Sequence, residues 1–76
     1  MTKDEFYFEL GNMLGLESGQ IRGPEKLVDL TGWDSIGMVM FMALADSKLG
    51  VLVAPSDLVA CQTVGDLVTL FPGKVS

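Results

Sequence analysis

The sequence predicts an all-α protein: a bundle of four helices, three main ones and one short one, with a long loop after the first. Two observations support this prediction. Apolar residues recur at helical spacing in three separate segments of the chain. Two of these segments begin with a capping box, in which a threonine is followed three residues later by an acid: Thr2 with Glu5, and Thr63 with Asp66. The apolar stretch 51–54 has no second strand with which to pair, so we expect an extended connector there.

The first helix is predicted over residues 2–14. Its start is the capping box at Thr2, and Gly15 is a natural stop just beyond its end. The apolar residues that share one helical face are Phe6, Leu10, Met13 and Leu14. This helix should therefore place a single apolar stripe on the core.

The segment that follows, residues 16–32, is predicted to be a loop because it is rich in glycine and contains a proline. A short helical turn is expected around residues 24–29. Leu27, Leu30 and Trp33 recur every three residues, and we expect their side chains to hold the loop against the core.

The second half of the chain predicts the other three helices. A long helix should cover residues 35–49, with Gly50 just past its end. A short helix should cover residues 55–60, after a proline, and the last helix should cover residues 63–71. Residues 72–76 are expected to fray. The predicted core consists of Phe6, Leu10, Leu14, Phe41, Leu49, Val64, Leu67, Val68 and Phe71.

Composition excludes several classes of function. The 76 residues suit one domain, residues 1–76, and the net charge of −5 with scattered basic residues argues against nucleic-acid binding. One cysteine and no histidine exclude an internal disulfide and a Cys/His metal site. The longest uncharged apolar run, residues 36–45, is about half as long as a membrane span, so no membrane insertion is expected. We expect a cytoplasmic monomer that holds no metal.

Ser35 is the candidate functional residue, and three roles compete for it. A hydrolase nucleophile would need a base, usually histidine, and the chain has none, so no catalytic residue is predicted. A helix cap is the common role of an Asp-Ser pair in front of a helix. The third role is an attachment point, because the N–H groups and the dipole at a helix N-terminus favour a phosphate group there.

The helix after Ser35 is apolar on almost every face. A chain of this size has too few elements to bury one helix on all sides, so part of this helix should stay exposed for a partner or an apolar ligand. The alternative is that the long loop covers it. Met38, Met40 and Met42 suit adaptable contacts, although methionine is also an ordinary core residue.

Residues 32–71 are GWDSIGMVMFMALADSKLGVLVAPSDLVACQTVGDLVTLF, and this pattern resembles the acyl carrier proteins. The features in common are an Asp-Ser motif at the start of the second helix, a glycine near its end, a short third helix after a proline, and the TVGDL opening of the fourth. The resemblance implies that Ser35 carries a covalent 4′-phosphopantetheine arm, that Asp34 orients this serine, and that Trp33 and Ile36 flank the arm. It also implies a carrier, not an enzyme, that holds acyl groups as thioesters.

The resemblance also implies partners. A phosphopantetheinyl transferase would install the arm, and acyl-activating, acyltransferase or synthase enzymes would use it. The residues expected to contact these partners are Ile36, Val39, Met40 and Ala43. Gly37 and Met40 stand where many fatty-acid carriers have acids. This difference favours a specialised pathway, such as polyketide, nonribosomal peptide or polysaccharide assembly.

Two alternatives stay open from the sequence. The chain could be an aminoacyl or peptidyl carrier with the same arm, or an unmodified helical interaction module with the same fold. The place of a cargo chain is also open. A small apolar cleft between the second and third helices would be bordered by Met42, Ala45, Leu58, Val59 and Cys61. Alternatively, Phe41 and Met42 fill that space.

Overall fold

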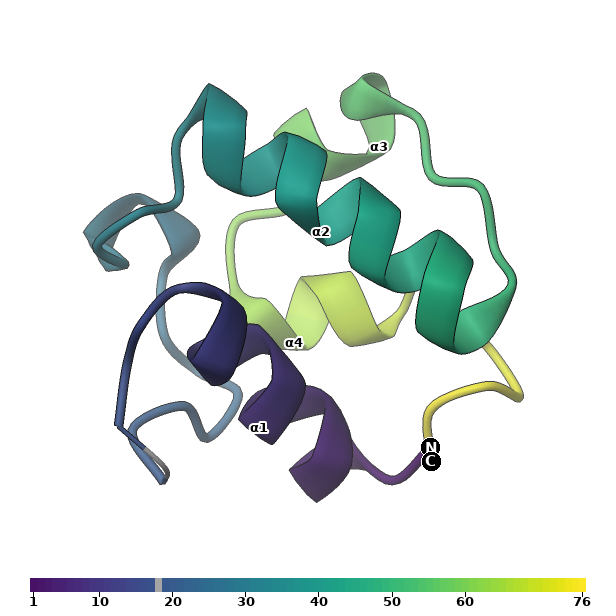
Figure 1. The fold of residues 1–76 in the computed structure, drawn as a ribbon, viewed down its shortest axis with the longest axis horizontal. Helices are drawn as coiled ribbons and strands as arrows, with labels where there is room; N and C mark the ends of the chain where they lie inside the picture. Colours follow the sequence, from purple (N-terminus) through teal and green to yellow (C-terminus); the bar gives the residue numbers. More distant parts are fainter. Residues whose placement is uncertain (18) are drawn as a thin grey trace.

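The computed structural model describes residues 1–17 and 19–76, and within them the all-α prediction is confirmed (Figure 1). The elements in chain order are α1 (Lys3–Met13), the 3₁₀ turn η1 (Leu27–Asp29), α2 (Ser35–Leu49), α3 (Pro55–Val59) and α4 (Val64–Val68). The described residues contain no strand and only one isolated antiparallel bridge, between Lys26 and Thr63. Helices α1 and α2 lie side by side and run in opposite directions, and the two chain ends meet (Figure 1).

Local capping explains where the helices begin. At α1, the Glu5 N–H donates to Thr2 Oγ1 over 3.1 Å, while the Thr2 N–H donates to Glu5 Oε1 over 2.9 Å. These hydrogen bonds with Thr2 lower the pKa of Glu5. Asp66 is bound in the same way at α4, and its pKa is lowered by the N–H groups of Gln62 and Thr63. Both capping boxes were correctly predicted from the sequence.

The ends of two helices carry a clear physical signature. Helix α2 ends at Gly50, whose φ of 66° is a left-handed conformation that glycine adopts without strain. Helix α4 is shorter than predicted and ends at Val68, although the chain continues in turns to Phe71. Beyond Val68 the N–H groups of Leu70 and Phe71 donate to the carbonyls of Leu67 and Val68, three residues earlier, so the chain continues in tighter turns and not as an α-helix.

The core is centred on three aromatic rings. Phe6, Phe41 and Phe71 are fully buried, and each pair of ring centroids is 6.0 Å apart. Six of the nine predicted core residues are buried, and the other three, Leu14, Leu49 and Val68, pack against them half-buried. The buried hydrophobic residues absent from the predicted core are Ile21, Leu27, Ala45, Leu58 and Val75.

The long loop is tied to the start of α4 by backbone hydrogen bonds. Leu27 N–H donates to the Gln62 carbonyl over 2.8 Å, and Val64 N–H donates to the Glu25 carbonyl over 3.0 Å. Gly65 N–H donates to the loop as well. Leu27 is buried, as expected for a residue that holds the loop against the core. The loop is therefore part of the folded structure that leads to Ser35.

The C-terminal segment differs from the expectation that residues 72–76 fray. Val75 is buried in the core, so its side chain resists release into water. The Ser76 N–H donates to the Met1 carbonyl over 3.0 Å, and the Lys3 N–H donates to the Ser76 carbonyl over 3.0 Å. The expectation was wrong because it considered the sequence of the tail alone. The N–H group at the start of α1 finds its acceptor there.

Candidate functional site

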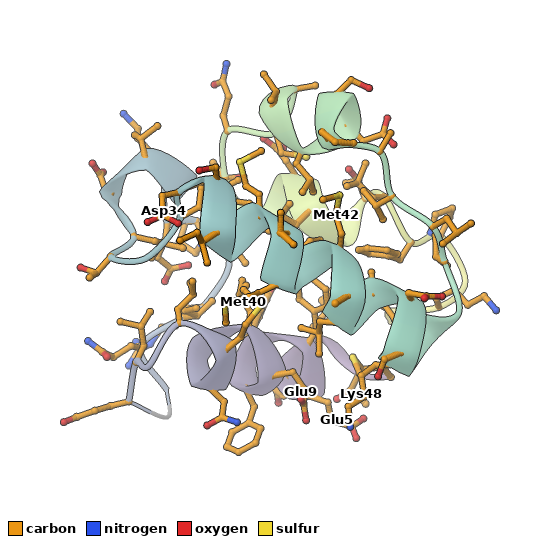
Figure 2. The ribbon with its side chains drawn as sticks, turned by 45° about the horizontal axis from the view of Figure 1, so that its top comes forward. Glu5, Glu9, Asp34, Met40, Met42 and Lys48 are labelled. Atoms are coloured by element: carbon orange, nitrogen blue, oxygen red, sulfur yellow. The ribbon has the colours of Figure 1, made fainter. Side chains whose placement is uncertain are left out.

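Ser35 is the first residue of α2 and is exposed to solvent. The cap of this helix is the preceding residue, because the Gly37 N–H donates to Asp34 Oδ1 over 2.9 Å and the Met38 N–H donates to the Asp34 carbonyl over 2.9 Å. Figure 2 shows Asp34 at this end of α2. The Asp-Ser pair therefore divides its roles: Asp34 caps the helix, and the Ser35 hydroxyl is not needed for capping.

The electrostatics of this helix end favour an anionic group. The first turn of α2, residues 35–38, contains no acidic side chain. The positive end of the helix dipole therefore lies beside an accessible hydroxyl, with only the Asp34 carboxylate nearby in the sequence. That carboxylate is engaged with the Gly37 N–H.

Trp33 anchors the loop that precedes Ser35. Its ring is half-buried and meets the Phe41 ring edge-on, with centroids 5.6 Å apart and planes at 70°. The Trp33 N–H donates to the Leu30 carbonyl over 3.2 Å. An aromatic pair of this geometry contributes about 0.5–1.5 kcal/mol beyond the area that it buries. Trp33 thus connects the loop, two residues before Ser35, directly to the aromatic core.

Gly37 is a feature of the site whose role sequence reasoning missed. It is buried in the first turn of α2, and a Cβ added to it would overlap the carbonyl oxygen of Gly32. Gly32 itself has a φ of 88°, a left-handed conformation that other residues rarely adopt. The sequence signal was present as two glycines around Ser35 in the spacing G-x-x-S-x-G, but this spacing does not by itself reveal the contact.

The residues expected to meet partners lie on the outer surface of α2. Ile36 is 70% exposed, Val39 59% and Met40 42%, and Ala43 is also exposed. The long loop therefore does not cover this face of the helix. Met40, the least exposed of the three, lies at the edge of this surface that borders α1 (Figure 2).

A surface hollow lies beside Ser35, between the end of α1 and the start of α2. Its volume is about 230 Å³. It is lined by Met13 and Leu14 from one side, by Ile36, Gly37 and Met40 from the other, and by Gly32 and Asp34. Since Asp34 and Ile36 are the immediate neighbours of Ser35, a group attached to Ser35 would start at the edge of this mainly apolar hollow.

The residues expected to border a cleft between α2 and α3 differ in their burial. Ala45 and Leu58 are each only 1% exposed and belong to the core. Met42 and Cys61 pack against that core half-buried, whereas Val59 is exposed. Two of the five residues expected to border a cleft are therefore packed in the core, which favours the alternative that core side chains occupy the space.

The surroundings of Cys61 disfavour its reactive thiolate form. Its Sγ donates to the Asp57 carbonyl over 3.3 Å. Burial raises the pKa of Cys61, and the negative charges of Asp66 and Asp57 raise it further. A thiol with a raised pKa is a poor nucleophile, because the thiolate is the reactive form.

The chain matches the family model described as the phosphopantetheine attachment site over residues 8–71. An acyl carrier protein of Rhodococcus erythropolis is 34% identical over 71 residues, which cover 88% of this chain and 78% of that protein. One of Thermotoga maritima is 33% identical over 66 residues, which cover 87% of this chain and 82% of that protein. The acyl carrier protein MbtL of Mycobacterium sp. (strain MCS) is 31% identical over 62 residues, which cover 82% of this chain and 70% of that protein.

A fold of four helices and a family match over most of the chain define a phosphopantetheine-binding protein. The chain belongs to the acyl carrier protein family. Members of this family are carriers and not enzymes, and they carry a covalently attached phosphopantetheine arm. A carrier works with enzymes that load its arm and use its cargo. Within residues 1–17 and 19–76, no helix is long and apolar enough to cross a membrane, and no cluster of potential metal ligands occurs.

Proposed function

We propose that Ser35 is the residue that carries the 4′-phosphopantetheine arm, and that the protein presents acyl groups to enzymes of a specialised pathway. The observation that carries the first part is the position of Ser35: an exposed hydroxyl at the first residue of a helix that is already capped by Asp34. The hydroxyl can be modified without removing a cap. The bound arm supplies a thiol on which an acyl group is held as a thioester.

The protein's own residues have three roles in this proposal. The N-terminus of α2 stabilises the negative charge of a phosphodiester on Ser35. Trp33, through its contact with Phe41, and Asp34, through its cap, hold the attachment point on a rigid part of the fold. Because the attachment point is rigid, the cargo reaches the partner's active site through motion of the arm alone. Tethering also raises the effective concentration of the cargo at that active site.

The outer face of α2 is proposed as the docking surface for the transferase and for the acyl-activating, acyltransferase or synthase enzymes. Ile36, Val39 and Met40 lie within two turns of Ser35 and remain exposed. An enzyme that reaches the arm must approach them. Between Ser35 and Gly50 the only charged residues are Asp46 and Lys48, whose charges cancel. Helix α2 therefore has no net charge with which to attract a basic partner enzyme, and this supports a specialised role rather than bulk fatty-acid synthesis.

The attachment is tested by intact-mass measurement after incubation with coenzyme A and a broad-specificity phosphopantetheinyl transferase. The wild-type protein should gain one arm, and Ser35→Ala should gain none. Ser47→Ala is the matched control, because Ser47 is an exposed serine elsewhere on α2, and it should gain one arm. Modification at Ser18, Ser47 or Ser56 would refute the assignment. A folded wild-type protein that gains no arm would instead favour an unmodified interaction module.

The class of cargo needs a separate measurement. The modified protein is loaded with short acyl groups, long fatty acyl groups and amino acids, and transfer to partner enzymes is compared. Efficient transfer of acyl groups by polyketide-type or related enzymes supports the proposal. Efficient transfer of amino acids alone would make the protein an aminoacyl carrier, and ready acceptance by fatty-acid synthase enzymes would overturn the specialised role.

We propose that the protein works as a cytoplasmic monomer, since its single cysteine requires no oxidising compartment.

A further inference from the structure

Two glycines on either side of Ser35 touch each other, and the contact joins the preceding loop to the first turn of α2. The backbone of Gly32 lies so close to the Cα of Gly37 that a Cβ there would overlap the Gly32 carbonyl oxygen and lie 3.2 Å from its carbonyl carbon. The same carbonyl oxygen accepts the Asp34 N–H over 3.0 Å. The four residues from Trp33 to Ile36 therefore form a short arch, and the glycines at its two ends, Gly32 and Gly37, touch each other.

Gly37 also holds the arch by its own N–H group. That N–H donates to Asp34 Oδ1 over 2.9 Å, while the Cα of the same residue faces Gly32. Gly37 thus contacts the loop in two ways. Its N–H group is bonded to Asp34, and its lack of a side chain lets the Gly32 backbone come close. Ser35 lies inside the arch that these two contacts close.

A glycine inside a helix destabilises it by about 0.5–1 kcal/mol relative to alanine, so this position calls for a compensating reason. Another buried helical glycine provides a comparison. A Cβ added at Gly11 in α1 would have as its nearest neighbour Ile21 Cδ1 at 3.7 Å, which is an ordinary van der Waals contact with a flexible side chain. At Gly37 the obstacle is backbone, which cannot move aside in this way.

We propose that Gly37 is a positioning residue for Ser35: its lack of a side chain lets the Gly32 carbonyl rest on the first turn of α2 and so fixes the direction of the serine hydroxyl. The inference rests on the proposed function of Ser35. Any side chain at position 37 pushes the loop off the helix, weakens the Asp34 cap and turns the attachment point. The docking residues Ile36, Val39 and Met40 remain on the helix surface when this happens.

This arrangement predicts a specific kinetic effect in the transferase reaction with coenzyme A. Gly37→Ala should lower kcat by about 10- to 100-fold, the size of effect that follows from misplacing a reacting group by about 1 Å. KM for the carrier should stay near the wild-type value, because the docking face is unchanged. Gly11→Ala, the matched control, should retain both parameters. Each variant is assayed well below its melting temperature, with circular dichroism to confirm its fold.

Two further variants sharpen the test. Gly37→Asp adds a negative charge two residues after Ser35, in a first turn of α2 that contains no acidic side chain, so recognition governed by charge would favour the variant with a basic transferase. Recognition governed by position predicts that its kcat falls at least as far as that of Gly37→Ala. Gly32→Ala disturbs the same contact from the loop side, because a side chain is strained at its φ of 88°. Its kcat should also fall, and it replaces Gly37→Ala should that variant not fold.

The outcomes separate this inference from the proposed function. A wild-type protein modified at Ser35, together with folded Gly37→Ala or Gly32→Ala that retains wild-type kcat, would overturn the inference and leave the proposed function intact. A rise in KM with unchanged kcat would overturn it as well, because that result would assign Gly37 to docking. A wild-type protein that gains no arm at Ser35 would overturn both.

Discussion

Changing Met40 to glutamate should weaken the docking of the transferase on the outer face of α2. Met40 is 42% exposed and lies beside the hollow that adjoins Ser35. A partner that docks there removes much of the remaining exposed surface of this side chain from water. In Met40→Glu the same docking would have to desolvate a carboxylate.

The size of the effect follows from burial. Full burial of a methionine or valine side chain is worth about 1.5–3 kcal/mol relative to full exposure, so a side chain that is about half exposed contributes about 1 kcal/mol when a partner covers it. Leaving a polar group without a partner in the interface adds about 1 kcal/mol or more. A total loss of about 2 kcal/mol corresponds to a rise in KM of about 30-fold.

The assay is the initial rate of arm transfer from coenzyme A as a function of carrier concentration, at low salt and at high salt. Phe8→Glu is the matched control, because Phe8 is 54% exposed and lies on α1. It introduces the same charge on an apolar residue away from the proposed docking face, so its KM should match the wild type. Val39→Asp should behave like Met40→Glu. Added salt should change the wild-type KM little, because apolar contacts are not screened in the way that surface ion pairs are.

A steep loss of turnover on adding salt, with Met40→Glu harmless, would refute this reasoning. It would show that the acidic residues elsewhere on the surface carry recognition. An equal loss in Phe8→Glu would point to a general effect of added negative charge on an acidic protein rather than to a docking face.

Two further predictions concern the core and the cargo. Phe41→Ala should lower the free energy of unfolding by about 3–5 kcal/mol, because the ring is buried among three other aromatic rings, whereas Phe8→Ala should lower it by less than about 1 kcal/mol; equal losses in urea unfolding would contradict the aromatic core. Loading the arm with short acyl groups should leave the methyl NMR signal of Met42 unchanged, because Ala45 and Leu58 are already buried in the core on this side of the protein. A shift at Met42 that grows with chain length would reveal a cargo cleft there.

Local signals in the sequence were sufficient to predict that the helices form and where they begin. Capping boxes at Thr2 and Thr63 and the glycine after α2 act within a few residues, so their meaning does not depend on the rest of the fold. The same holds for the exposed outer face of α2. Its apolar residues outnumber the neighbours that a chain of this length can place around one helix.

Long-range contacts were not predictable in the same way. Nothing near Val75 indicates that it closes the core against the first residues of the chain, or that the Ser76 carbonyl accepts the Lys3 N–H. The pairing of residues 23–27 with residues 62–65 likewise joins segments that are far apart in the sequence. Periodicity reports which face of an element is apolar, but it does not report which distant segment covers that face.

The site falls between these two cases. The pattern around Ser35 identified the residue of interest, but it left open whether Asp34 or Ser35 caps the helix, and the structure assigns the cap to Asp34. The pair Gly32 and Gly37 was visible as a spacing, and only the folded structure shows that the two backbones touch. A glycine has no side chain to suggest a partner, so its role depends entirely on what approaches it.

Helix α2 combines a buried face that holds the fold together with an outer face that the fold does not use. Phe41 and Ala45 are each 1% exposed, while Ile36 and Val39 are more than half exposed on the same helix. Exposed apolar side chains reduce solubility, and the net charge of −5 counteracts this because most of the acids lie outside α2. Since the outer face contributes little to the core, its residues can be changed with little effect on stability. Stability and partner recognition should therefore respond to different substitutions on one helix: Phe41 controls the first, and Val39 and Met40 control the second.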